Sequence, residues 1–103
     1  MFRITTHRLA VVVNDAMRDL MEKFGESRLA IEDAVESKGT SYYASDLEDA
    51  VDQVNEVLVD WKNLQNSLET EGRTDELATL RKENEMKLKQ LEAEIEALQH
   101  DDD

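Results

Sequence analysis

Apolar residues recur at steps of three and four along almost the whole chain, and this periodicity constrains the fold more than any other sequence feature. In residues 75–99, DELATLRKENEMKLKQLEAEIEALQ, they form a single narrow stripe. Such spacing places side chains on one face of a helix. The chain has no proline and only three glycines, so little interrupts long helices. The sequence therefore predicts an all-α fold.

Three helices are expected, over about residues 6–37, 46–71 and 73–99. Gly39 can take the left-handed backbone that ends a helix, and Gly72 marks the second joint. Ser45 and Glu48 have the spacing of a capping box, which predicts where the second helix begins. Gly25 allows a bend or a break in the first helix. We expect an antiparallel helical hairpin over residues 1–72, a coiled-coil helix over 73–99 and an acidic tail over 100–103.

The second helix carries an apolar stripe wider than a single neighbouring helix needs, so it is expected to contact more than one. The third helix can therefore close a three-helix bundle, or it can extend as a C-terminal coiled-coil arm. The predicted core consists of Leu20, Phe24, Ile31, Leu47, Val51, Val54, Leu58, Trp61 and Leu68.

The stripe of the third helix is narrow, which is typical of a coiled-coil seam. We define the leucine seam as Leu77, Leu80, Asn84, Leu88, Leu91, Ile95 and Leu98. Two consecutive steps of four form a stutter, which locally relaxes a supercoil. Asn84 could pair with its twin in a parallel dimer, or it could point to water beside the stutter. The seam is the predicted interface for a second copy or a coiled-coil partner.

The formal net charge is −13, and no cluster of bases exceeds Arg81 and Lys82. Such a surface repels nucleic acid and anionic membranes, and no apolar run approaches the roughly 20 residues of a membrane span. The lack of cysteine fits a reducing compartment, so a cytoplasmic location is expected. The basic start of the chain, with Arg3, His7 and Arg8, makes mitochondrial import the less favoured alternative.

Catalysis is not expected. The chain has no glycine-rich phosphate loop and no nucleophile beside a base, and its carboxylates map to solvent faces of the helices. His100 and the three aspartates after it could resemble a metal site, but a flexible terminus does not pre-organise ligands. We therefore expect no enzyme activity, no cofactor and no metal.

Residues 42–69, YYASDLEDAVDQVNEVLVDWKNLQNSLE, resemble the last helix of a spectrin-type repeat. There, a glycine-containing turn precedes a long helix with a central tryptophan and a leucine three residues later, as at Gly39, Trp61 and Leu64. The chain departs from that family because no opening helix is present and Gly72 interrupts the run. The three-helix plan is also similar to the tubulin-binding cofactor A chaperones, without a shared residue motif.

The expected function is protein–protein association. The preferred hypothesis is a small structural or adaptor subunit that self-associates or joins a coiled-coil assembly. The alternative is a monomeric acidic three-helix protein, either chaperone-like or an inhibitor that mimics nucleic acid, which binds a basic client.

Overall fold

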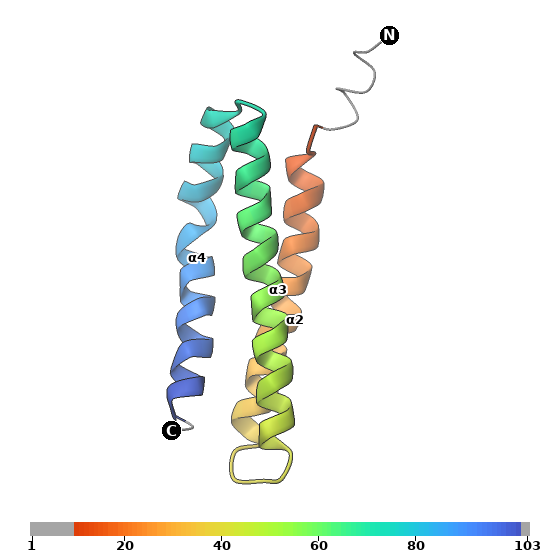
Figure 1. Ribbon diagram of the computed structural model, residues 1–103, viewed down its shortest axis with the longest axis vertical. Helices are drawn as coiled ribbons and strands as arrows, with labels where there is room; N and C mark the ends of the chain where they lie inside the picture. Colours follow the sequence, from red (N-terminus) through yellow and green to blue (C-terminus); the bar gives the residue numbers. More distant parts are fainter. Residues whose placement is uncertain (1–9, 102–103) are drawn as a thin grey trace.

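A computed structural model describes residues 10–101, with only the backbone of Asp101, and this part of the chain forms three long helices (Figure 1). α2 spans Val13–Glu36, α3 spans Tyr43–Thr70 and α4 spans Thr74–Asp101. Successive helices run in opposite directions, so α2 and α4 point the same way and α3 runs against both. The predicted all-α fold is confirmed, and it takes the form of a helix bundle.

α3 lies between α2 and α4 and packs on both, whereas α2 and α4 contact each other only slightly (Figure 1). The wide apolar stripe of α3 therefore serves two neighbours, as predicted. Its contact with α2 is the more extensive one. Small buried residues from both helices explain this, because short side chains allow two helix axes to approach closely. They are Ser27, Ala30, Ala34 and Ala50.

The turn between α3 and α4 is a Schellman motif. The N–H of Gly72 donates to the carbonyl of Glu69 at 3.1 Å, and the N–H of Arg73 donates to that of Leu68 at 2.9 Å. These two bonds satisfy carbonyls that the end of α3 would leave without partners. Gly72 has a φ of 73° and Gly39, in the turn after α2, has a φ of 83°. The left-handed backbone predicted at Gly39 is confirmed.

The predicted starts of the first two helices are wrong. α2 begins at Val13, because the backbone of Val11 bonds to Glu71 and Arg73 instead of continuing a helix. α3 begins at Tyr43, so Ser45 lies within the helix and not at its N-cap. The predicted capping box therefore does not form. Tyr43 packs against the core, and this contact extends the helix toward the turn.

Other boundaries also differ from expectation. α2 continues through Gly25 without a break, since the glycine is exposed and nothing approaches it. α4 extends to Asp101, so the predicted tail is helical at residues 100–101. No glycine or proline stops the helix there. The expected helix over residues 6–9 and the tail at 102–103 lie outside the described residues.

Candidate interaction surfaces

The leucine seam of α4 is buried within the single chain. All seven seam residues, from Leu77 to Leu98, are buried, and Leu91 in the middle is only 1% exposed. The six apolar ones belong to one cluster with buried residues of α2 and α3. The face that the sequence assigns to a second chain is thus covered by the chain's own helices.

Asn84 is the polar residue of this seam, and its side chain is 9% exposed. Its amide nitrogen donates to the carbonyl of Leu80 at 3.1 Å, one turn earlier in the same helix. A buried amide needs hydrogen-bond partners, and here one is supplied locally. The amide therefore does not depend on a twin in a second chain for this bond.

The nine predicted core residues occupy two kinds of position. Leu20, Phe24, Val54, Trp61 and Leu68 are buried in the centre of the bundle. The other four lie partly exposed at its border: Ile31, Leu47, Val51 and Leu58. Val57 and Leu64 are also buried, as are the small residues between α2 and α3.

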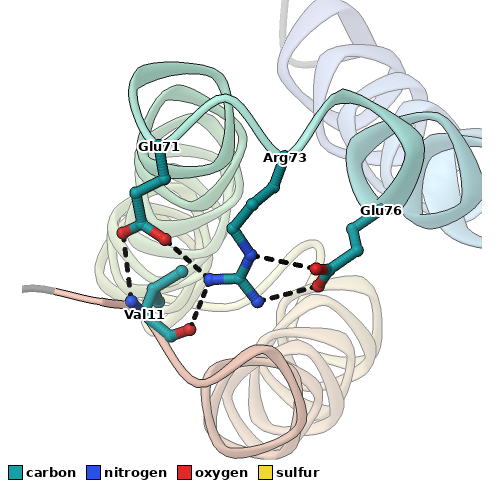
Figure 2. Close-up of polar contacts among 4 residues, drawn as sticks. All are labelled: Val11, Glu71, Arg73 and Glu76. Atoms are coloured by element: carbon teal, nitrogen blue, oxygen red, sulfur yellow. Dashed lines mark hydrogen bonds and ion pairs between the residues drawn. The ribbon is translucent and has the colours of Figure 1, made fainter. Parts of the chain in front are cut away.

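An ionic cluster ties the segment before α2 to the α3–α4 turn (Figure 2). We call Val11, Glu71, Arg73 and Glu76 the Arg73 cluster. The Arg73 guanidinium donates to Glu71 at 2.6 Å, to Glu76 at 2.7 and 3.0 Å, and to the carbonyl of Val11 at 2.8 Å. The N–H of Val11 in turn donates to Glu71 at 3.0 Å. The cluster therefore fixes the direction in which the chain enters α2.

These contacts shift the pKa values of the three charged side chains of the cluster. The hydrogen bond from Arg73 is the main cause that lowers the pKa of Glu71, and the N–H of Val11 adds to it. The same guanidinium lowers the pKa of Glu76. Conversely, Glu76 and Glu71 raise the pKa of Arg73 above its already high value. All three groups are therefore held in their charged forms at neutral pH.

The Arg73 cluster was not predicted from the sequence. The spacing of Arg73 and Glu76 on the first turn of α4 is a usable signal, because charges three residues apart on a helix are neighbours. Val11 could not be predicted as a partner, since it lies 60 residues from Glu71.

Two further ion pairs connect the helices. Lys23 on α2 contacts Glu56 and Asp60 on α3, each at 2.8 Å. The hydrogen bonds that this lysine donates to Asp60 and then to Glu56 raise its pKa. On the other flank of α2, Arg28 contacts Glu94 on α4 at 3.0 Å. Arg28 also lies 5.9 Å from the ring centre of Phe24. The flank of α2 that carries Lys23 therefore faces α3, and the flank that carries Arg28 faces α4.

Charge is unevenly distributed along the bundle. Residues 29–60, which form the end of α2, the following turn and most of α3, hold nine acidic residues and one base, Lys38. Residues 90–101 at the end of α4 hold four acids and no lysine or arginine. Because α4 runs against α3, its end lies beside the start of α3 (Figure 1). We call this part of the bundle, residues 29–60 and 90–101, the acidic end.

Several large apolar side chains remain exposed on the described part of the chain: Val12, Leu29, Val35, Tyr42, Val59 and Met86. Four of them belong to the acidic end: Leu29, Val35, Tyr42 and Val59. Exposed apolar side chains beside charge are a common property of interaction surfaces.

Within residues 10–101, no group of three or more histidine and carboxylate side chains is arranged to hold a metal ion. His100 lies exposed near the end of α4. None of the three helices described is long and apolar enough to cross a membrane.

Three antiparallel helices around one apolar core define the chain as an all-α helical domain. The family model described as the embryogenesis-like protein helical domain matches residues 14–100, and the chain belongs to that family. This match is to a family other than the two that the sequence resembles. Comparisons with curated proteins and with solved structures give no significant match.

Proposed function

We propose that this helical domain is a non-catalytic protein-interaction module that uses its acidic end to bind a basic surface of a partner protein. The observation that supports this proposal is the imbalance of nine acids to one base over residues 29–60. A surface of one sign attracts partners of the opposite sign and speeds their encounter.

The proposal favours the acidic binding module over the self-associating coiled-coil subunit. Self-association through the leucine seam would require α4 to leave α3, because the seam is already buried in the single chain. Two copies with a charge of −13 each would also repel one another at long range. Self-association nevertheless stays a testable prediction, and a solution mass decides it.

The experiment is affinity capture with matched charge variants of the full chain. Glu48→Lys with Asp52→Lys changes two exposed residues of the acidic end, and Asp15→Lys with Glu69→Lys changes two exposed residues near the other end. Both double variants alter the net charge by the same amount. A difference in partner retention between them therefore shows which part of the surface binds the partner.

We expect partners from an extract of the protein's own cells to be basic. They should be retained by the wild type and by the Asp15 and Glu69 variant, and lost from the Glu48 and Asp52 variant. Equal retention by all three proteins would show that the acidic end is not the binding surface. Raising the salt concentration should release the partner, since screening weakens contacts between exposed charges.

A further inference from the structure

One flank of α2 carries an apolar stripe whose residues range from buried Phe24 to exposed Val35. Met17, Met21, Phe24, Arg28, Ile31 and Val35 follow steps of four, three, four, three and four. This spacing places them on one face of the helix. Arg28 belongs to this stripe and reaches Glu94, so the stripe faces α4.

This flank is only partly covered. Two hollows of about 350 and 330 Å³ lie between α2 and α4, one near each end of the bundle. The first is lined by Arg28, Ile31, Val35 and Glu94, and the second by Val13 and Leu80. Met17 and Met21, which lie between these positions along α2, are half-buried. We call the flank and its two hollows the α2/α4 groove.

The groove combines an apolar floor with an acidic rim. Carboxylates line both hollows: Glu32, Glu36, Glu94, Asp75, Glu76 and Glu83. Arg28 is the one base that lines either hollow, and it is paired with Glu94. The groove therefore matches an occupant that is apolar on one side and positively charged on the other.

The groove also has the shape that a helix fills. α2 and α4 run in the same direction and both pack on α3 (Figure 1). Among the described residues, a fourth helix laid along the flank between α2 and α4 would complete a four-helix bundle. From Met17 to Val35 the stripe is about 27 Å long at 1.5 Å per residue, which corresponds to roughly three heptads of a helix. Methionines suit such a surface, because their flexible side chains adapt to different partners.

We propose that the α2/α4 groove binds a basic amphipathic helix of a partner protein and so completes a four-helix bundle. The proposal rests on the proposed function and names where on the module the partner binds. A second copy of this chain is a poor occupant, since its own helices present an excess of acidic side chains.

The probe is a synthetic helical peptide of about three heptads, with leucine at the a and d positions and lysine elsewhere. The full chain contains four methionines, and their ¹³C-labelled methyl groups give separate NMR signals. We expect the signals of Met17 and Met21 to shift in a saturable manner as the peptide is added. Met86 is 80% exposed on the outer face of α4 and is the internal control, so its signal should not shift.

A matched pair of variants tests the position. Val35→Lys places a charge in the groove, and Val12→Lys makes the same change just before α2, at a residue that lines neither hollow and lies outside the acidic end. The two valines are similarly exposed, at 49% and 59%. We expect Val35→Lys to weaken peptide binding at least tenfold and Val12→Lys to weaken it less than twofold. Circular dichroism verifies that both variants keep the helical fold.

Each other result overturns the proposal. If the peptide shifts Met86 as strongly as Met21, or if both valine variants weaken binding equally, the groove is not the site. The proposed function survives that result provided that Glu48→Lys with Asp52→Lys still abolishes binding. If no peptide binds, both proposals fail. If a peptide with glutamate in place of lysine binds equally well, charge does not select the occupant. If Met17 and Met21 shift with protein concentration alone, a second copy covers the groove.

Discussion

Replacing Leu91 by alanine tests whether the leucine seam serves the single chain. Leu91 is 1% exposed, so the substitution removes three fully buried carbon atoms. At roughly 0.8 kcal/mol for each buried CH₂ group, the transfer term alone is about 2.4 kcal/mol. The cavity left behind increases this cost, and buried leucine-to-alanine changes typically cost about 2.7–5.0 kcal/mol. We expect the free energy of unfolding to fall by about 3 kcal/mol. This is a large part of the total, which is roughly 5–15 kcal/mol for a typical domain.

The assay is urea unfolding followed by circular dichroism, at two widely different protein concentrations. Met86→Ala is the control on the same helix, because this side chain is 80% exposed and its loss should change stability by less than about 0.5 kcal/mol. If the seam is internal, the loss caused by Leu91→Ala is independent of protein concentration. A midpoint that rises with concentration in the wild type, and no longer does so in Leu91→Ala, would refute the reasoning, because it would place the seam between chains.

Three further predictions concern Gly25 in α2, Gly72 in the α3–α4 turn and the Arg73 cluster. Gly25→Ala should raise the free energy of unfolding by about 0.5–1 kcal/mol in a thermal melt, because Gly25 is helical and nothing lies near it. Gly72→Ala should lower it by about 1–2 kcal/mol, since alanine is strained at a φ of 73°, and an unchanged melting temperature would contradict the turn geometry. Arg73 lowers the pKa of Glu71 and Glu76 in the folded chain. The two glutamates therefore contribute fully to the free energy of unfolding above the pKa of about 4.3 that glutamate has in the unfolded chain. This contribution is lost as the pH falls through their lower pKa values in the folded chain. Urea midpoints measured against pH should therefore fall less steeply on acidification in Arg73→Met than in the wild type.

The helices themselves were predictable from sequence, because periodicity and the absence of proline both act locally. The surface that the leucine seam contacts could not be predicted from the sequence. A stripe such as Leu88, Leu91 and Ile95 is equally apolar whether it packs on α3 or on another chain, and only the arrangement of all three helices decides. The width of the apolar stripe on α3 did predict the arrangement, because a stripe that wide requires two neighbouring helices, and α3 contacts both α2 and α4.

The ends of the helices depend on distant residues, and there the local signals failed. Ser45 and Glu48 have the correct spacing for a cap, yet the packing of Tyr43 on the core extends α3 beyond them. α2 starts late because Glu71 and Arg73 bind the backbone of Val11. The α2/α4 groove was likewise hidden, since Met17 and Met21 look like ordinary core positions until α4 is in place.

Light scattering of the full chain, alone over a concentration series and then with the lysine-rich peptide, tests the central claim most directly. The account predicts the mass of one chain at every concentration, and an increase by one peptide per chain when the peptide is added. A mass of two chains without peptide, which falls to one chain on dilution, would contradict it and would assign the leucine seam or the α2/α4 groove to self-association.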